Sequence, residues 1–332
     1  MAQVMTVTGP VDSNELGTVL MHEHVFINEL REERAVGLLN DYELMKAELE
    51  AFKAAGGRTI VELTTAELTT GAAQDPQGLF SGVASSGYAE NGTREPNQVL
   101  DLARMSRELG LHIVAGAGHY RNPYLDEAWI DRHSVDDIAQ RIVADIEQGF
   151  GSTGIRAGII GEIASDKWHL SAAEERSFRA AARAQLATGL AISTHASRWP
   201  VGLAQLDVLA AEGADPRRVI IGHCDTVNIP EYHLAIAERG AYVQFDTIRG
   251  DNEYYTQRRI GYVHDLIDKG HVSQILLSHD VCTKTHLRAH GGKGYTYVLG
   301  EFADRLLQSG VSPECIETMI QRNPHRVLGV AR

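Results

Sequence analysis

The sequence predicts an α/β protein folded as a (β/α)8 barrel, and three observations lead to this prediction. Eight short runs of β-branched and aliphatic residues alternate with amphipathic stretches along the 332 residues. Most of these runs are continuously apolar, as is typical of parallel strands that are covered on both faces. The segment at the end of the first run reads HEHVF, whereas a doubly wound open sheet would be expected to carry a Gly-rich phosphate loop there. Eight strands alternating with helices over this length favour one barrel domain spanning 1–332.

The eight predicted strands are spaced so that a helix fits between most neighbours. In chain order they are TVLMHEHV (18–25), RTIVELT (58–64), HIVAGAG (112–118), AGIIGEIA (157–164), AISTHAS (191–197), RVIIGHCD (218–225), AYVQFDT (241–247) and QILLSHD (274–280). The predicted helices have an amphipathic pattern, and several begin with Ser or Asp and end with Gly, which are common start and stop signals. The clearest are 41–57, 134–150, 171–189 and 261–270.

One connection is much longer than the others. Residues 65–96 are rich in Gly, Ser, Ala and Asn, and they follow a predicted strand. In a barrel this connection lies on the C-terminal face, where active sites are built. Loops of this length without secondary structure of their own tend to be functional or disordered. Two interpretations are open, a lid over a substrate and an insertion without a role.

The composition is that of an ordinary soluble protein, with 43% hydrophobic and 23% charged residues. A formal charge of −13 argues against nucleic acid and anionic membranes as partners. The sequence has no run of about 18 apolar residues, and its first residues lack the basic start and apolar core of a signal peptide. Its 3 cysteines stand far apart, which fits a reducing compartment, so we expect a cytoplasmic protein.

Ionisable side chains end several of the predicted strands, each after a run of aliphatic residues. Any one of them has an ordinary explanation: a histidine pair can be packing, a buried Glu can pair with an Arg, and an Asp can cap a helix. Burying such groups unpaired costs several kcal/mol, and the strand ends of a barrel converge on one rim. A shared metal site explains all of them together. The six residues are His22, His24, Glu162, His195, His223 and Asp280.

The number and type of these side chains favour two metal ions over one. His22 and His24 are two residues apart, so strand alternation places both imidazoles on one face. Four imidazoles and two carboxylates are too many for one tetrahedral zinc, but they suit two divalent ions about 3.5–4 Å apart that share a bridging carboxylate and hydroxide. A water between two cations loses its proton near neutral pH and becomes a nucleophile. Asp280 is the predicted catalytic residue, a metal ligand that also handles the proton.

Five motifs that carry these residues resemble the metal motifs of the phosphotriesterase family in the amidohydrolase superfamily. They are TVLMHEHV, GIIGEIA, STHAS, IGHCD and LLSHD, and their order and approximate spacing match over essentially the whole chain. With GAYVQFDTI and GGKGYTY, the resemblance is closest to the phosphotriesterase homology and phosphotriesterase-related branch. It implies a barrel with two divalent ions, zinc first and manganese or cobalt as alternatives, and it is compatible with a homodimer.

The resemblance also implies how the six residues divide. The first histidine pair and Asp280 would hold the more buried ion, and His195 and His223 the more exposed one. The namesake enzymes bridge the two ions with a carboxylated lysine on the fourth strand, where this chain has Glu162. A glutamate supplies the same bidentate bridge, so the binuclear site is expected to persist.

Other residues around the expected site bear on the substrate. Organophosphate hydrolases of this family carry a histidine, and acyl-homoserine lactonases an arginine, after the strand-seven aspartate, whereas here Asp246 is followed by Thr247. Tyr120 matches a tyrosine that lactonase members place over the leaving oxygen, and a rim aromatic without that role is equally open. Asp225 either orients a ligand histidine or caps the next helix. Four residues on loops of the active face either bind a carboxylate or sulfonate or are ordinary solvated charge: Arg249, Lys284, His286 and Arg288.

These observations predict a binuclear metal-dependent hydrolase whose hydroxide attacks a carboxylic ester, a lactone first. Hydrolysis of small N-acyl amides is the alternative, because resemblance to the phosphotriesterase-related branch also suggests it, and phosphotriester cleavage is a plausible side activity. A rival from another class is a metal-bearing barrel that only binds a small molecule. In each case the predicted partner is a small molecule.

Overall fold

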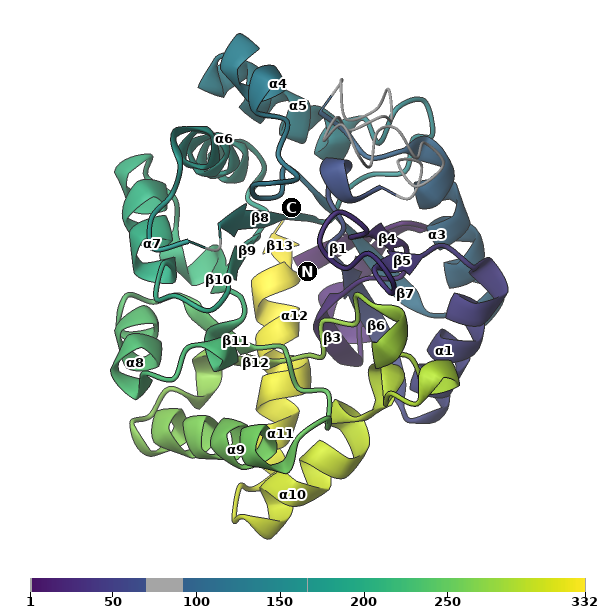
Figure 1. The fold of residues 1–332 in the computed structure, drawn as a ribbon, viewed down its shortest axis with the longest axis vertical. Coiled ribbons are helices and arrows are strands. Elements are labelled where there is room, and N and C mark those ends of the chain that lie inside the picture. The colour runs from purple at the N-terminus through teal and green to yellow at the C-terminus, as the bar shows by residue number, and fades with distance from the viewer. Residues whose placement is uncertain (1, 70–91, 166, 332) are drawn as a thin grey trace.

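The computed structural model describes residues 2–69, 92–165 and 167–331. Its centre is a barrel of eight strands that follow chain order around the sheet, and helices surround it (Figure 1), which confirms the predicted fold class. Each strand corresponds to one of the eight predicted runs. They are β3 (Thr18–Glu23), β6 (Gly57–Glu62), β7 (His112–Ala117), β8 (Ile159–Ser165), β9 (Ile192–Ala196), β10 (Val219–Ile221), β11 (Tyr242–Phe245) and β12 (Ile275–Leu277).

A buried carboxylate fastens the seam where the first barrel strand meets the last. Glu23, at the end of β3, accepts hydrogen bonds from Ser278 Oγ (2.8 Å), from His279 N and Nδ1 (both 2.9 Å) and from Val281 N (2.9 Å). Ser278 is 255 residues away in the sequence. These bonds satisfy a fully buried charge and close the barrel on the side of the predicted site.

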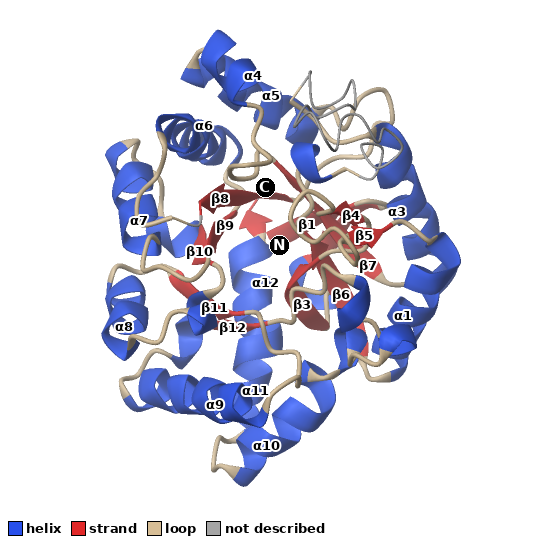
Figure 2. Ribbon diagram, viewed as in Figure 1, coloured by secondary structure: helices blue, strands red, loops and turns tan. Residues whose placement is uncertain are grey.

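Helices pack around the outside of the barrel, as Figure 2 shows in blue. Ser134 and Ser171 each cap a long helix by accepting a bond from the backbone three residues on, and Asp137 and Glu174 accept in return from the cap N–H. Such capping boxes satisfy free N–H groups of the first turn.

The helices include α1 (Tyr42–Ala54), α3 (Pro96–Leu109), α4 (Glu127–Arg132), α5 (Val135–Glu147), α6 (Ala172–Thr188), α7 (Gly202–Ala211), α8 (Pro230–Glu238), α9 (Glu253–Asp268), α10 (Ala303–Gln308), α11 (Pro313–Glu317) and α12 (Asn323–Leu328).

Two apolar cores hold these layers together. The smaller core fills the barrel interior with strand side chains such as Val19 and Ile220, and Val4 of β1 (Ala2–Thr6) and Leu328 of α12 belong to the same cluster. The larger core joins the strands to the surrounding helices. Because β1 and α12 plug the N-terminal end of the barrel, the C-terminal ends of the strands are left to form a site.

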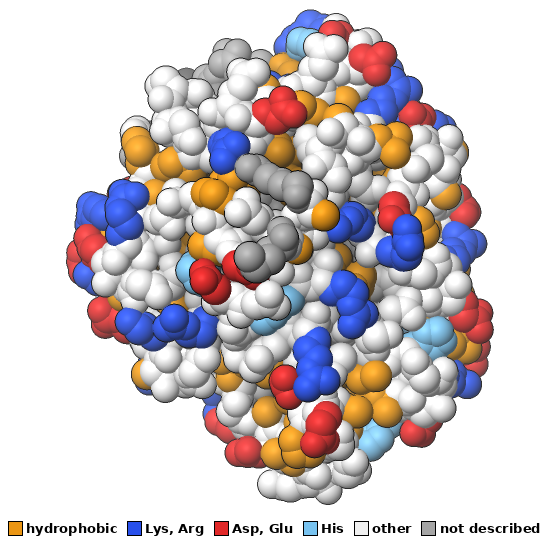
Figure 3. Space-filling view, turned by 180° about the vertical axis from the view of Figure 1, so that it is seen from behind, with side chains coloured by type: hydrophobic (Ala, Val, Ile, Leu, Met, Phe, Trp, Pro, Cys, Tyr) orange, Lys and Arg blue, Asp and Glu red, His pale blue; other side chains and the backbone are white. Residues whose placement is uncertain are grey.

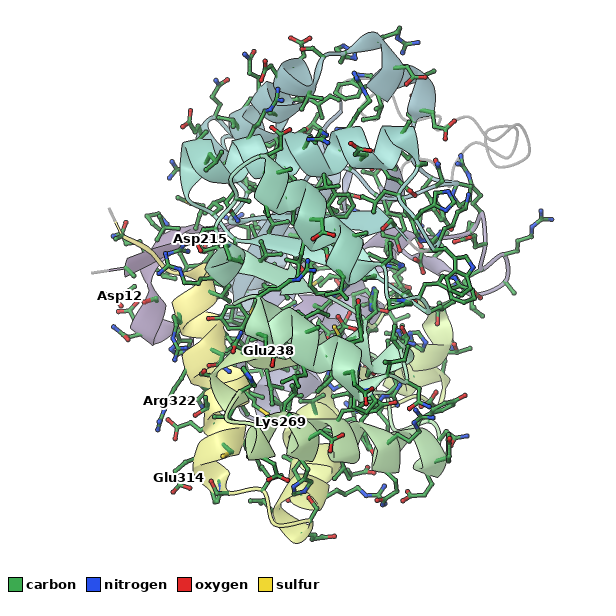
Figure 4. All side chains as sticks on the ribbon, turned by 90° about the vertical axis from the view of Figure 1, so that its left-hand side faces the viewer. Asp12, Asp215, Glu238, Lys269, Glu314 and Arg322 are labelled. Carbon is green, nitrogen blue, oxygen red and sulfur yellow. The ribbon has the colours of Figure 1, made fainter. Side chains whose placement is uncertain are left out.

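The two ends of the described chain meet in a small antiparallel sheet. β1 (Ala2–Thr6) pairs with β2 (Gly9–Asp12) on one side and with β13 (Val330–Ala331) on the other. Figure 4 shows the labelled Asp12 and Glu314 on this side of the molecule. The plug at the N-terminal end of the barrel is therefore built from both ends of the chain.

The surface carries charges of both signs. Figure 3 shows acidic and basic side chains interspersed with small apolar patches over the face turned away from the view of Figure 1. Within the described ranges, no helix combines the length and the apolar character that crossing a bilayer requires.

The long connection predicted as a lid or an insertion is only partly described. Thr65 and Thr69 are buried and flank a turn of 3-10 helix at Ala66–Leu68, and α3 begins at Pro96, where the predicted loop ends. Residues 70–91 lie outside the described residues. The predicted lid or insertion falls mainly on these residues.

Most barrel strands end one or two residues earlier than the sequence indicates, and β10 and β12 end four and three residues early. β10 stops at Ile221 and β12 at Leu277, and the site residues that follow, His223 and Asp280, have left-handed φ angles of 55° and 54°. This region is unfavourable for residues with a side chain, and hydrogen bonds at the rim offset it, such as the one from His223 N to Asp246 Oδ1 (3.0 Å). Both residues therefore stand on turns beyond the strands, where strand alternation no longer decides the direction of a side chain.

Candidate metal centre

The structure brings the six predicted ligands together at the C-terminal rim of the barrel, with Glu162 in their midst. Its Oε1 is 2.7 Å from His195 Nδ1, 3.0 Å from His223 Nε2 and 3.5 Å from His22 Nε2. Its Oε2 is 3.9 Å from His24 Nε2. All five side chains are buried. Glu162 was expected to end its strand, but β8 continues to Ser165, so this carboxylate projects from the middle of β8 and faces imidazoles from both sides, where a bridging group would lie.

Asp280 lies on the side of the first histidine pair. Its Oδ1 is 3.4 Å from His24 Nε2 and 3.9 Å from His22 Nε2. Arg249 Nη2 donates to the other carboxylate oxygen at 2.6 Å and to the backbone oxygen of the same residue at 2.7 Å. The geometry therefore places Asp280 beside His22 and His24, the grouping that the resemblance implies.

The carboxylates dominate the electrostatics of the cluster. Burial opposes the charge on Glu162, but His22 and His195 outweigh it and hold the pKa of Glu162 well below its usual range. Burial also opposes protonation of His22, yet Glu162 and Asp246 raise the pKa of His22 well above its ordinary value. Against the same burial, Asp246 raises the pKa of His223 to about 10. Burial and His223 lower the pKa of His195 to about 4. The cluster as a whole attracts positive charge, which a divalent cation supplies.

The donor atoms converge in a way that fits a cation. His223 Nδ1 donates to Asp246 Oδ1 at 2.7 Å, and in the neutral ring that binds a metal its Nε2 carries the lone pair, only 3.0 Å from the Glu162 carboxylate. Two acceptors this close repel each other unless a proton or a cation lies between them. His22 Nε2 is buried without a hydrogen-bond partner among the described residues. Two groups with the spacing of a metal site share Glu162, namely His22, His24, Glu162 and Glu162, His195, His223.

The proton of His24 is positioned by hydrogen bonds from behind the ring. Thr64 Oγ1 is 3.0 Å from His24 Nδ1, and it donates its one proton to Glu62 Oε1 (2.6 Å) or to Phe26 O (3.1 Å). Glu62 is ion-paired with the buried Arg94 at 2.6 Å, so both alternatives are acceptors. Thr64 must therefore accept from His24 Nδ1. The lone pair of His24 then lies on Nε2, the atom that faces the carboxylates of the centre.

Replacing Thr64 by valine, which keeps the shape but removes the acceptor, is expected to weaken binding of one of the two predicted metal ions by about 10- to 100-fold. A chelator titration of the metal-loaded protein measures both affinities. Thr65→Val is the matched control, because the buried hydroxyl of Thr65 has no hydrogen-bond partner in the described part of the chain. Equal affinities in Thr64→Val and the unaltered protein would show that this hydroxyl does not orient His24.

Asp246 has a larger part in the site than the sequence indicates. Its Oδ1 is 2.7 Å from His223 Nδ1 and its Oδ2 is 3.0 Å from His22 Nδ1. One carboxylate thus hydrogen-bonds His223 and lies beside Nδ1 of His22, a position from which supporting residues of metal sites orient ligand histidines. In the sequence, Asp246 serves only to locate Thr247, the residue that follows it. An acidic residue at the end of a buried strand is nevertheless a signal that would have identified Asp246 as a candidate site residue.

Asp225 does neither of the two things expected of it. Its carboxylate accepts from Asp246 N at 3.1 Å, from Thr247 Oγ1 at 2.5 Å and from Arg259 Nε at 2.7 Å. These bonds join the turn after β10 to the end of β11 and to α9. Asp225 therefore stabilises the cavity wall beside the centre. It neither orients a ligand histidine directly nor caps α8.

A cavity of about 700 Å³ lies over the centre, and the predicted substrate contacts differ in their relation to it. Tyr120 lines it with its hydroxyl 3.2 Å from His195 Nδ1. Arg249 also lines it, but two of its nitrogens are engaged with the 279–280 segment. His286 lines it as well, with Nδ1 accepting from two backbone N–H groups, and burial lowers its pKa to about 3. The ring nitrogen that faces those amides is therefore unavailable to a substrate.

Lys284 and Arg288 lie outside this lining, among the residues that the structure describes. Each begins a short 3-10 turn, and Lys284 N donates to Val36 O at 2.9 Å, which fixes the backbone beside the cavity. The prediction of Lys284 as a substrate contact is therefore not supported by the geometry.

Several charged residues line the cavity without having been predicted. They stand on loops and on α9 and belong to no motif, so the sequence offers no signal for them. Glu29 is one example: burial and the neighbouring Asp280 raise its pKa to about 7. The others include Glu32, Arg121, Arg198, Asp251, Arg258 and Arg259.

Comparison with known proteins agrees with this geometry. The family described as "Phosphotriesterase family" matches residues 2–74 and 92–328. The phosphotriesterase homology protein of Escherichia coli (strain K12) is 36% identical over 310 residues, covering 93% of this chain and 96% of the relative. An N-acetyltaurine hydrolase of Dictyostelium discoideum is 28% identical, covering 99% of this chain and 98% of the relative.

A solved structure of a lactonase from Listeria monocytogenes superposes with a TM-score of 0.84 at 25% identity, and the match covers 100% of both chains. The likeness to these proteins therefore extends over the whole barrel and not over a single motif.

Proposed function

The chain belongs to the phosphotriesterase family and is a metal-dependent hydrolase, and from this premise we propose that it cleaves carboxylic esters, lactones first. The observation that carries the proposal is the position of Glu162, which contacts four histidines while Asp280 contacts two of them. This arrangement suits a centre that holds two divalent ions and a proton-transfer group side by side.

The residues fit two ions. The first histidine pair with Asp280 would hold one ion, His195 and His223 would hold the other, and Glu162 would bridge them in place of a carboxylated lysine. We propose zinc, with manganese and cobalt as the alternatives, because imidazole and carboxylate ligands suit all three. When bound, two such ions lower the pKa of a water and polarise a carbonyl oxygen.

The chain's own residues provide the proton transfer and the orientation. Burial opposes the charge on Asp280, but Arg249 and His24 hold its pKa well below the usual range, so the carboxylate is ionised at neutral pH and can accept a proton. It can return that proton to the leaving oxygen. Tyr120, with its hydroxyl beside His195, is placed to donate a hydrogen bond to the same leaving oxygen.

Hydrolysis of small N-acyl amides is the second candidate. It is favoured by the likeness to an N-acetyltaurine hydrolase, which covers 99% of this chain. An amide nitrogen must be protonated before it leaves, so this reaction depends more heavily on Asp280 as the acid. Phosphotriester cleavage is a proposed side activity of the same centre.

A substrate panel tests the proposal. The zinc- or manganese-loaded protein is assayed with γ- and δ-lactones, with N-acetyltaurine and other N-acyl amino compounds, and with paraoxon. We expect kcat/KM for the best lactone to exceed that for the best amide by at least about 10-fold, or about 1.4 kcal/mol. The reverse order would replace the lactone proposal by the amide one, and no turnover of either class would overturn both.

A further inference from the structure

Arg259 lines the cavity, and two of its three guanidinium nitrogens are fixed by hydrogen bonds. It stands on α9 (Glu253–Asp268), where Nε donates to Asp225 Oδ2 at 2.7 Å and Nη2 donates to Thr247 Oγ1 at 2.6 Å. The guanidinium is planar and rigid, so two anchored nitrogens determine the direction of the third. Nη1 is therefore held in place before any ligand arrives.

Nη1 has no hydrogen-bond partner among the described residues, although the atom is buried and Arg259 is only 7% exposed. Its nearest carboxylate oxygen belongs to Asp251, at 4.0 Å, and the Asp251 side chain is 62% exposed. A contact of this length to a solvated carboxylate contributes little. A buried cationic donor without a partner is costly, and a ligand oxygen at this place would remove that cost.

The same cavity joins Arg259 to the metal centre. Asp225, which holds the guanidinium, accepts from Asp246 N at 3.1 Å, and Asp246 Oδ1 is 2.7 Å from His223 Nδ1. Tyr255 lies beside the guanidinium, with its ring centre 5.8 Å from the guanidinium carbon, and it also lines the cavity. A molecule whose reacting group lies at the centre can therefore reach Arg259 along this wall.

We propose that Arg259 Nη1 anchors a negatively charged oxygen group of the substrate, a carboxylate or a sulfonate, at the end remote from the bond that is cleaved. Arginine only donates, so its partner must be an acceptor, and charge-assisted bonds are about twice as strong as neutral ones. The class of substrate is then an acyl compound with an anionic arm. The identity of the cleaved bond depends on the proposed function, but the anchoring role of Arg259 does not.

Matched substrate pairs test the anchor. 4-Acetamidobutanoate is compared with 4-acetamidobutanamide, and a lactone with a carboxylate arm is compared with its primary amide. We expect the anionic member to have a KM at least about 10-fold lower. Arg259→Lys should remove this preference, so that the two members of each pair have the same KM in the variant.

The variant is chosen so that the fold survives. Lysine keeps a positive charge beside the buried Asp225 but cannot span Asp225, Thr247 and the cavity at once. Arg258→Lys is the matched control, because Arg258 lines the same cavity but its nitrogens donate to Tyr254 and Tyr262. Thermal unfolding and metal content show whether either variant is damaged, and Arg259→Gln is the second variant if the lysine does not fold.

A binding measurement separates this proposal from the proposed function. Calorimetry compares propane-1-sulfonate with propane-1-sulfonamide on the metal-loaded protein. If no panel substrate is turned over but Arg259→Lys abolishes sulfonate binding, the anchor stands and the proposed function fails. If esters or amides are hydrolysed with equal KM for both members of each pair, in the unaltered protein and in Arg259→Lys, the anchor is wrong and the proposed function stands.

Discussion

Glutamine in place of Glu162 is expected to lower kcat/KM by about 1,000-fold or more, which corresponds to about 4 kcal/mol of transition-state stabilisation. Glu162 Oε1 is within 3.5 Å of ring nitrogens of His195, His223 and His22, so the substitution removes a negative charge that the two proposed ion sites would share. The amide keeps the shape of the side chain and one oxygen. Elemental analysis after dialysis against metal-free buffer should find two ions per chain in the unaltered protein and fewer in the variant.

Glu33→Gln is the control for this experiment. Glu33 lines the same cavity but is exposed to solvent, and a surface substitution of this kind is expected to change activity by less than about threefold. Two tightly held ions per chain in Glu162→Gln would show that Glu162 does not bridge them.

Asparagine in place of Asp280 is expected to lower kcat by about 100- to 10,000-fold, the range for loss of a general acid–base group. The depressed pKa of Asp280, which Arg249 and His24 cause against the effect of burial, keeps this carboxylate ionised and ready to accept a proton at neutral pH. Asparagine retains the Oδ1 that faces His24 at 3.4 Å, but it cannot accept that proton. Steady-state kinetics should therefore show a fall in kcat with metal content unchanged.

Asp251→Asn serves as the comparison for Asp280→Asn with an uncharged lactone as substrate. Asp251 is a second aspartate of the cavity, and its side chain is 62% exposed, so its loss should leave kcat within about threefold. Wild-type kcat in Asp280→Asn with both ions present would refute the proton role. Loss of an ion together with activity would assign Asp280 to metal binding alone.

The fold and the set of candidate ligands could be predicted because both depend on patterns along single strands. A run such as IIGEIA shows at once that Glu162 follows buried aliphatic residues, and the alternation of strands with helices brings such strand ends to one rim. The predicted sixth and eighth strands are too long, because they include His223 and Asp280, which have left-handed φ angles on turns. Their conformation is stabilised by hydrogen bonds from other strands, and local sequence does not show these.

The supporting residues could not be predicted for the same reason. Thr64 determines the tautomer of His24 only because Glu62 and Arg94 are paired behind it, and Arg94 lies on the loop before α3. Arg259 acquires its orientation from Asp225 and Thr247, which are 34 and 12 residues away. Such roles arise from the meeting of donors and acceptors in three dimensions, and a single side chain in the sequence carries no sign of them.

The hydrogen bonds of Glu23 make the site depend on a segment that is synthesised late, because its partners lie more than 250 residues further along the chain. It lies between His22 and His24 in the sequence, and its partners, from Ser278 to Val281, flank Asp280. A nascent chain that has not yet emerged past Val281 can neither make these bonds between its first strand and the segment after its last nor supply Asp280, the proposed acidic ligand beside the first histidine pair. Cation binding at the proposed centre would therefore follow synthesis of this late segment. A chain truncated ahead of Ser278 would keep the eight barrel strands but would lack Asp280 and the hydrogen bonds that join β3 to the segment after β12.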